Sequence, residues 1–300
     1  MRTLRRLVVA TFVLSLLEIA VGWMIGPGII RPANLNLERL QQSKEMLQRV
    51  SATREDFEVA VTDGVILRGW KVRPADPNGD WVLLFHGVSD NRSGMLGGAE
   101  VLLRHGYSVV MMDSRAHGKS DGTIATYGWK ERRDTVAIVQ SLYATEHVRH
   151  LYAWGVSMGA AIAIQSAAVE PRVEAVVAEA SFASLREVSY DYAGLEISPW
   201  IGKTIFRPAT IAALNRAGHD GGFDPDAVSP EVAVGERAFP LLVICGTADR
   251  RIPCRHAERI CRAAHGPCEI WAVEGAGHAA ALGRAPQEFE ERVIGFLHKN

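Results

Sequence analysis

The sequence predicts one α/β domain in which a mostly parallel sheet of eight strands carries helices on both faces. Three observations lead to this prediction. Short apolar segments alternate with helical ones through most of the chain, as in repeated βα units. Asp63-Gly64 separates two strand-like segments and indicates a hairpin that gives the sheet an antiparallel start. A Gly-x-Ser-x-Gly motif at residues 155–159 follows one apolar strand and precedes a helix.

Residues 1–30 differ from the rest of the chain. Three arginines precede an apolar run from Leu7 to Ile30, in which Glu18 is the one charge. Twenty helical residues span about 30 Å, the hydrocarbon thickness of a bilayer. The alternatives are an uncleaved signal anchor, a signal peptide cleaved at the small residues 20–22, and a buried soluble helix. We favour the anchor, because the apolar run continues beyond Gly22 without a polar segment.

The charges at Arg2, Arg5 and Arg6 also predict an orientation. The positive-inside rule keeps this end in the cytoplasm and exports the rest of the chain. The expected location is therefore membrane-anchored on the extracytoplasmic side or, if the signal is cleaved, secreted or periplasmic. Disulfides persist there, and Cys261 and Cys268 are candidates for a bridge from a helix end to the next strand. The alternative is that the cysteines are small buried apolar residues.

Composition excludes several classes of protein. The chain has 33 basic and 34 acidic residues, so we expect no nucleic-acid binding through a strongly basic face. Its 48% hydrophobic content excludes general disorder. Four cysteines in 300 residues are too few for a disulfide scaffold. They form no Cys-x-x-Cys pair, so a zinc site is not expected either.

The remaining elements follow in chain order. A linking segment over residues 31–55 contains a helix at 34–50, and the α/β domain covers residues 56–300. Strands are predicted at 57–62, 65–72, 81–85, 107–112, 151–156, 173–178, 241–245 and 269–273, and helices at 94–104, 130–145, 158–169, 255–264 and 287–298. The mostly unalternating apolar runs suit strands buried on both faces. Residues 185–240 break the rhythm and are expected to form a lid insertion after strand 6, over the carboxyl edge of the sheet.

Gly-x-Ser-x-Gly occurs twice, around Ser120 and around Ser157. A nucleophile elbow needs a buried strand, a sharp turn and then a helix, and only Ser157 has this context. Ser120 stands in a polar loop and is interpreted as an ordinary loop hydroxyl. Nor is this loop a phosphate-binding loop, because Asp113 occupies the position of its first glycine.

A serine hydroxyl is a poor nucleophile unless a base and an orienting acid stand beside it. Asp249 and His278 both follow predicted strands, in the order serine, acid, histidine that elbow-type enzymes use. Because the carboxyl ends of parallel strands share one edge of a sheet, the three side chains are expected to meet. Glu179, after another strand, is the alternative acid.

The loop after the third strand contains His86-Gly87-Val88. An acyl-transfer site needs backbone donors for the oxyanion, one from this loop and one from the residue after the nucleophile. Val88 and Met158 are therefore the predicted N–H donors. His86 is assigned to shaping the loop rather than to acting as a base.

These stretches resemble a known family. Residues 84–92, 112–120, 155–159, 245–253 and 275–278 are similar to the α/β-hydrolase superfamily, and within it to the bacterial serine-aminopeptidase-like or acyl-peptidase-like branch. The resemblance covers residues 57–297, with Ala116 standing where relatives usually have Gly. It implies the α/β-hydrolase fold, the nucleophile Ser157, the acid Asp249, the base His278 and the oxyanion donors Val88 and Met158.

The expected function is a membrane-anchored serine hydrolase that cleaves small-molecule carboxylic esters without a metal or organic cofactor. Peptide, amide or thioester cleavage by the same triad is the alternative within enzymes. An inactive binding module on the same fold is an alternative that the intact triad disfavours. Substrate preference is expected to depend on the pocket and on residues 185–240, because a fold does not fix function.

Overall fold

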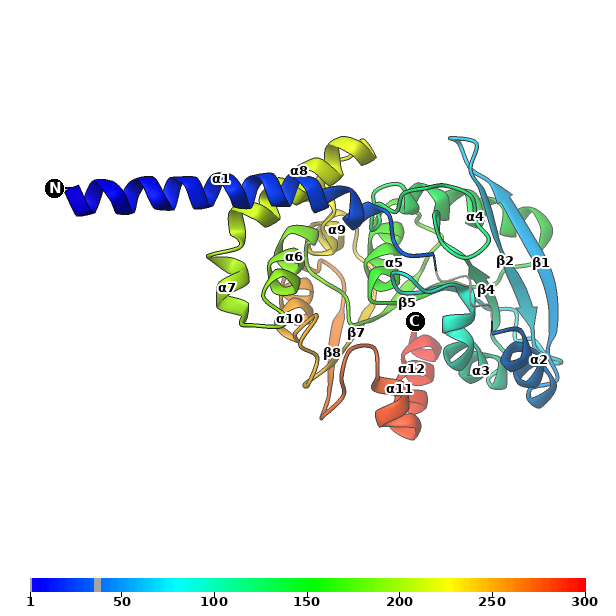
Figure 1. Cartoon of the computed structure of the whole chain (residues 1–300). Coiled ribbons are helices and arrows are strands. Elements are labelled where there is room, and N and C mark those ends of the chain that lie inside the picture. The colour runs from blue at the N-terminus through cyan, green and yellow to red at the C-terminus, as the bar shows by residue number, and fades with distance from the viewer. Residues whose placement is uncertain (1, 35–38) are drawn as a thin grey trace.

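The computed structural model describes residues 2–34 and 39–300 (Figure 1). Eight strands form one sheet in the order β1-β2-β4-β3-β5-β6-β7-β8. The strands are β1 (Thr53–Ala60), β2 (Ile66–Arg73), β3 (Trp81–Phe85), β4 (Ser108–Met112), β5 (Leu151–Val156), β6 (Ala175–Glu179), β7 (Leu241–Gly246) and β8 (Cys268–Val273). All eight coincide with predicted strands to within a few residues.

The helices comprise twelve α-helices and two short 3-10 turns in the described residues. They are α1 (Arg2–Ile30), α2 (Leu40–Arg49), η1 (Arg92–Met95), α3 (Leu96–Arg104), α4 (Glu131–Thr145), α5 (Met158–Val169), α6 (Leu185–Ala193), α7 (Pro199–Lys203), α8 (Arg207–Gly221), η2 (Pro225–Ala227), α9 (Pro230–Glu236), α10 (Arg255–Ala263), α11 (Ala281–Arg284) and α12 (Pro286–Lys299). The helix predicted at 34–50 begins at Leu40, and part of that prediction falls on residues 35–38, outside the described residues.

The sheet has the expected antiparallel start. β1 and β2 pair antiparallel, with Ala60 opposite Ile66, and Gly64 takes a φ of +81° in the turn between them. The strands from β3 to β8 run parallel, and β2 is antiparallel to its other neighbour, β4. The strands β3 to β7 are buried on both faces and largely apolar, whereas the edge strand β8 is partly exposed.

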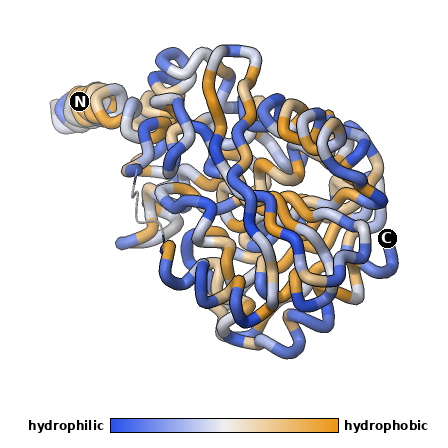
Figure 2. Tube along the Cα trace, turned by 90° about the vertical axis from the view of Figure 1, so that its right-hand side faces the viewer, coloured by the Kyte–Doolittle hydropathy of each residue, from blue (hydrophilic) through white to orange (hydrophobic). Residues whose placement is uncertain are grey.

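Helices cover both faces of the sheet. One apolar core joins the strands to α4, α5, α9 and α10, and a second joins them to α2, α3 and α12. Figure 2 shows hydrophobic stretches along the strands inside the body and many of the hydrophilic stretches at its periphery. The segment between β6 and β7 contains the predicted insertion at 185–240. Residues of its helices α6 and α8 line a cavity together with Ser157, at the carboxyl edge of the sheet. Its last helix, α9, packs against α5 and α10 beside the sheet, so α6, α7 and α8 form the part that departs from the layers.

The N-terminal segment is one continuous helix that is long and apolar enough to cross a membrane. Only 6% of its most apolar window is buried, so the alternative of a buried soluble helix is wrong. The first part of α1 extends away from the body, and its last part lies along α8 (Figure 1). Its final residue, Ile30, is fully buried in a cluster with α6 and α8.

The four cysteines form two disulfides. Cys261–Cys268 is the bridge proposed from the sequence, with its Cα atoms 5.4 Å apart. Cys245 and Cys254 form the second, also with a Cα separation of 5.4 Å, where the loop after β7 folds back on the strand end. The alternative that Cys245 is a free buried apolar residue is therefore wrong. This pairing could not be predicted, because it depends on the course of the loop after β7, which the sequence does not reveal.

Candidate active site

Ser157 stands at a sharp turn between β5 and α5. Its φ and ψ of 57° and −117° lie in a region that costs a non-glycine residue free energy. The flanking glycines make the turn possible. A Cβ at Gly155 would lie 2.1 Å from the carbonyl oxygen of Gly159, and a Cβ at Gly159 would lie 2.1 Å from that of Phe85. The motif thus brings α5 close to β3 and exposes the hydroxyl at the carboxyl edge of the sheet.

His278 lies between the two other predicted residues. Its Nε2 atom is 2.9 Å from Oγ of Ser157, and its Nδ1 atom is 2.8 Å from Oδ2 of Asp249. A carboxylate accepts hydrogen bonds, so Nδ1 carries the proton and Nε2 presents its lone pair to the hydroxyl. The structure therefore brings together the three side chains that the sequence predicted, across 121 and 29 residues of chain.

The carboxyl group of Asp249 is fixed from its other side. Oδ1 accepts hydrogen bonds from the backbone N–H groups of Arg251 and Ile252, at 2.8 and 3.0 Å. The side chain of Asp249 is fully buried. With one oxygen bound to the loop, the other is aimed at the imidazole.

Glu179, the alternative acid, lies nearby with another role. Its Oε1 atom accepts from the backbone N–H of Ala281 at 3.0 Å, and its backbone carbonyl accepts from the N–H of Ser157 at 2.9 Å. Burial raises the pKa of Glu179. Glu179 therefore connects the serine turn to the segment after His278. From its sequence position Glu179 was expected only as an alternative acid, and its place after a buried strand was the available signal for the role seen in the structure.

The two predicted oxyanion donors are free to serve a ligand. Among the described residues, neither the N–H of Val88 nor that of Met158 donates to a protein acceptor. Met158 is the first residue of α5, where N–H groups have no partner within the helix. The neighbouring loop is close, because a Cβ at Gly87 would lie 3.6 Å from Cβ of Ser157.

His86 holds that loop in place, as the sequence suggested. Its Nδ1 donates to the carbonyl of Gly87 at 2.8 Å, and its Nε2 accepts from the N–H of Ser114 at 3.0 Å. Burial lowers the pKa of His86, which fits an imidazole that is a donor at one nitrogen and an acceptor at the other.

Ser120, in the other Gly-x-Ser-x-Gly motif, has its hydroxyl hydrogen-bonded to the backbone around it. Its hydroxyl donates to the carbonyl of Asp113 at 2.7 Å and accepts from the N–H of Arg68 at 2.8 Å. This buried hydroxyl ties the loop after β4 to β2. The interpretation of Ser120 as a structural residue agrees with these contacts.

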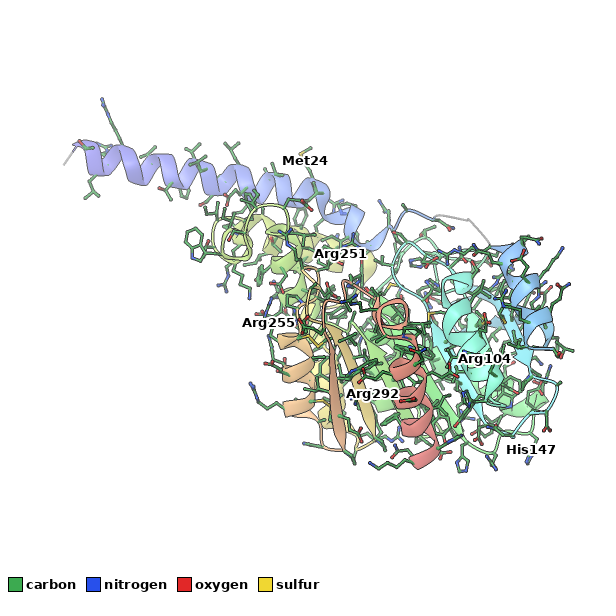
Figure 3. All side chains as sticks on the ribbon, turned by 90° about the horizontal axis from the view of Figure 1, so that it is seen from below. Met24, Arg104, His147, Arg251, Arg255 and Arg292 are labelled. Atoms are coloured by element: carbon green, nitrogen blue, oxygen red, sulfur yellow. A yellow bond between two sulfur atoms is a disulfide. The ribbon has the colours of Figure 1, made fainter. Side chains whose placement is uncertain are left out.

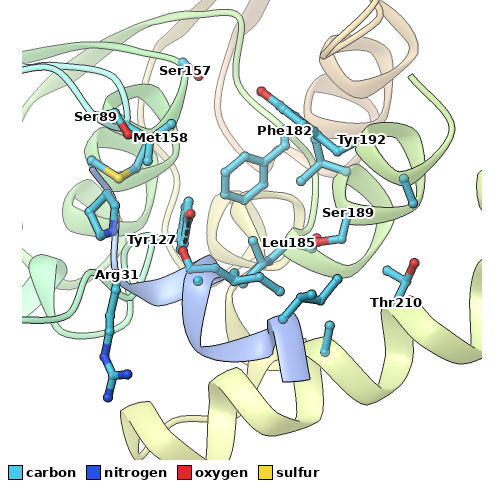
Figure 4. Close-up of a pocket in the computed structure, with 18 of the residues that line it drawn as sticks. Arg31, Ser89, Tyr127, Ser157, Met158, Phe182, Leu185, Ser189, Tyr192 and Thr210 are labelled. Atoms are coloured by element: carbon cyan, nitrogen blue, oxygen red, sulfur yellow. Dashed lines mark hydrogen bonds between the residues drawn. The ribbon is translucent and has the colours of Figure 1, made fainter. Parts of the chain in front are cut away.

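A cavity of about 640 Å³ opens beside Ser157 (Figure 4). Its lining is mainly apolar. It comes from the C-terminal part of α1 and the residues just after it, from the loops after β3, β4, β6 and β7, from the serine turn at the start of α5, and from α6 and α8. Representative residues are Val88, Met158, Phe182, Leu185, Val188, Phe206, Ala213 and Ile25. Arg31 is the one charged residue among the described lining residues. No cluster of three or more His, Cys, Asp or Glu side chains able to hold a metal occurs in the described part of the chain.

This sheet order, with a serine at a sharp β5–α5 turn and helices on both faces, is the α/β-hydrolase fold. The comparisons with known proteins agree. Residues 76–216 match the family model described as serine aminopeptidase, S33. An esterase from Pyrococcus furiosus, Pf2001, has a similar structure with a TM-score of 0.69 and 25% identity, over 84% of this chain and 93% of that one. The chain therefore has the α/β-hydrolase fold and is similar to members of the α/β-hydrolase superfamily.

Two further proteins are similar over most of the chain. The uncharacterized protein YqkD of Bacillus subtilis is 27% identical over 247 residues, which are 80% of this chain and 78% of that protein. Est1E of Butyrivibrio proteoclasticus, solved with ferulic acid bound, shares the fold with a TM-score of 0.61 and 18% identity, over 80% of this chain and 98% of its own.

Proposed function

We propose that the protein is a membrane-anchored serine hydrolase that cleaves carboxylic esters, with Ser157 as nucleophile, His278 as base and Asp249 as the orienting acid. One observation carries the proposal. The hydroxyl of Ser157 lies 2.9 Å from the imidazole of His278, which lies 2.8 Å from the buried carboxylate of Asp249, so the three side chains form one hydrogen-bonded chain. Such a hydrogen-bonded chain converts a serine hydroxyl into a nucleophile.

In the first half of the reaction, Oγ of Ser157 attacks the ester carbonyl as its proton passes to Nε2 of His278. The carbonyl electron pair moves onto oxygen, and the oxyanion is bound by the N–H groups of Val88 and Met158. The tetrahedral intermediate then collapses. The bond to the alcohol oxygen breaks, and Nε2 returns its proton to that oxygen as the alcohol leaves.

The second half releases the acid. Water attacks the acyl-enzyme while His278 takes one of its protons, and a second oxyanion forms in the same place. Collapse breaks the bond between the acyl carbon and Oγ, which regains the proton. Asp249 stabilises the imidazolium in both halves without being protonated itself.

The lining of the cavity favours an uncharged acyl group over a peptide amino terminus. An aminopeptidase binds a cationic amine, which needs a carboxylate in the pocket. The described lining residues include no Asp or Glu, and the one charged residue, Arg31, would repel an ammonium group. The printed name of the Pyrococcus furiosus relative, an esterase, supports the same choice.

We further propose that residues 1–30 anchor the chain, that residues 31–55 link the anchor to the body, and that residues 56–300 form the catalytic domain on the extracytoplasmic side. Within this domain, residues 185–240 are proposed to include the lid. The two disulfides support this side of the membrane, because disulfides persist in oxidising compartments. Arginines before the apolar run support the same orientation.

Hydrolysis of p-nitrophenyl acetate by the full chain tests the proposal. Ser157→Ala should abolish nearly all turnover and all labelling by a fluorophosphonate probe, with the circular dichroism spectrum unchanged. The matched control is Ser120→Ala, in the other Gly-x-Ser-x-Gly motif, which should still be labelled. Equal turnover in Ser157→Ala and the unmodified protein would overturn the assignment. Cleavage of an aminoacyl p-nitroanilide in preference to the ester would replace the esterase by a peptidase.

A further inference from the structure

The last turns of α1 form one wall of the cavity beside Ser157. Val21, Ile25 and Ile29 line it, together with Ala209 and Ala213 of α8. The three α1 residues are four positions apart and therefore share one helix face, over about 12 Å of its length. Val21 and Ile25 are still 53% and 59% exposed, so the cavity is open along this wall.

The contact between α1 and α8 is tight. A Cβ at Gly22 would lie 2.0 Å from the carbonyl oxygen of Ala209, and a Cβ at Gly26 would lie 2.6 Å from that of Ala213. Glycines four residues apart that face small residues on a second helix allow close backbone approach, as in membrane helix pairs. The sequence at residues 22–26 is therefore adapted to α8 and not only to lipid.

The C-terminal end of α1 is also bound to the body. The hydroxyl of Tyr127 donates to the carbonyl of Ile29 at 2.7 Å, and the N–H of Ala125 donates to the carbonyl of Ile30 at 2.8 Å. These bonds satisfy carbonyl groups that a helix end otherwise leaves without partners. Tyr127 also lines the cavity, so the residue that fixes the end of α1 belongs to the pocket itself (Figure 4).

The body carries apolar side chains where α1 leaves it. Ile197, Trp200 and Ile205 flank or belong to α7, just before α8 begins, and they are 63%, 65% and 47% exposed. Figure 1 places α7 on the side toward which the free part of α1 extends. Residues 3–20 of that free part rise about 27 Å, close to the thickness of bilayer hydrocarbon. Tryptophan is favoured at the membrane surface, so this patch continues the membrane-facing surface of α1.

We propose that α1 is both the membrane anchor and a wall of the acyl-binding pocket, and that the substrate is a bilayer-resident amphiphile with a long acyl chain. The acyl chain enters from the membrane along the exposed face of α1 that carries Val21 and Ile25, and it brings its ester to Ser157. This inference rests on the proposed esterase function and names its substrate class. It also requires that α1 stays attached in the mature protein, because cleavage at residues 20–22 would detach the α1 residues before the cleavage site and free the remainder of the wall from the anchor.

The test uses the full chain in phosphatidylcholine vesicles that contain p-nitrophenyl palmitate, with p-nitrophenyl acetate as the short ester. Ile25→Trp adds bulk at the wall. Met24→Trp is the matched control, because Met24 is 79% exposed, does not line the cavity and lies on the outer side of α1 (Figure 3). We expect the palmitate-to-acetate ratio of kcat/KM to fall about tenfold or more in Ile25→Trp and to stay within about twofold in Met24→Trp.

The possible failures are distinguishable. Unmodified protein that hydrolyses neither ester contradicts the proposed function itself. Protein that hydrolyses acetate in a Ser157-dependent way, but shows the same ratio in both tryptophan variants, keeps the function and overturns the pocket wall. Intact-mass measurement of the membrane-extracted protein provides a readout independent of activity: we expect the mass to include residues 21–30, and a mature chain that begins after Gly22 overturns the inference.

Discussion

Oδ2 of Asp249 lies 2.8 Å from Nδ1 of His278, whereas the carboxyl group of Glu179, at the end of the neighbouring strand, binds the backbone N–H of Ala281. Glu179 ends β6, and Asp249 lies three residues beyond the end of β7, at the same edge of the sheet. Their roles differ because the loop after β7 turns the side chain of Asp249 toward the imidazole.

Asp249→Asn should lower kcat for p-nitrophenyl acetate by about 10⁴-fold, because an amide no longer holds the imidazole in the tautomer that accepts a proton from serine. The fold should be retained, since the amide oxygen can still accept from the N–H groups of Arg251 and Ile252. Steady-state kinetics with circular dichroism measures both effects.

The matched variant is Glu179→Gln, whose amide oxygen can still accept from Ala281. It should change kcat/KM by less than about threefold. The opposite ranking of the two variants would make Glu179 the catalytic acid.

Gly159→Ala tests the close approach of α5 to β3. The added Cβ would lie 2.1 Å from the backbone oxygen of Phe85, which cannot rotate away. We expect the free energy of unfolding to fall by about 2–3 kcal/mol. Gly295→Ala is the control, because Gly295 is exposed in α12 with open space around its Cα, and alanine there should raise stability by about 0.5–1 kcal/mol. Urea denaturation followed by fluorescence gives both values, and equal small effects would contradict the tight turn.

The strands β3 to β7 could be predicted from sequence because they are buried on both faces and therefore largely apolar, whereas the edge strands β1 and β8 are partly exposed. Ser157, Asp249 and His278 follow the carboxyl ends of β5, β7 and β8. A strict order of strands and a common edge are enough to bring these side chains together. The prediction of Val88 and Met158 as oxyanion donors follows the same reasoning, because the position of a backbone N–H group depends on the turn and not on the side chain.

The sequence did not reveal how loops and amphipathic surfaces meet. The pairing of Cys245 with Cys254 depends on the loop after β7, which carries no periodic pattern. The apolar run of α1 predicts a membrane segment, but its hydropathy is the same whether a residue faces lipid or a pocket. Gly22 and Gly26 were the available signal for α8, because small residues spaced by four favour helix contact.

The disulfide between Cys245 and Cys254 closes the loop that carries Asp249. The chain-entropy relation gives about 2.5 kcal/mol for a loop of this length, so the double substitution to alanine should lower the free energy of unfolding by about that amount. It should also lower kcat, because the loop that aims Asp249 is released. Thermal unfolding and p-nitrophenyl acetate kinetics measure the two effects.

The second disulfide is the control for that experiment. Cys261 and Cys268 close a loop of similar length away from Asp249, so their double alanine variant should lose comparable stability and little kcat. Equal loss of kcat in both variants would show that the effect is one of general stability. Thiol titration of the unfolded protein should find reactive thiols only after reduction.

His117 should make stability fall in mild acid. The side chain is fully buried against His86, and burial lowers the pKa of His117 from 6.5 to about 4. Between these values the unfolded chain binds a proton that the folded chain does not, so the free energy of unfolding decreases as the pH falls through this window. The full difference corresponds to about 3 kcal/mol.

In His117→Asn, whose amide can still donate to the carbonyl of Arg115, the decrease in the free energy of unfolding between pH 6.5 and pH 4 should be smaller by about that amount. Urea denaturation across this pH range measures the slopes, with His147→Asn, at an exposed histidine, as the matched control. An unchanged slope in His117→Asn would mean that His117 gains its proton in the folded protein as readily as in the unfolded chain.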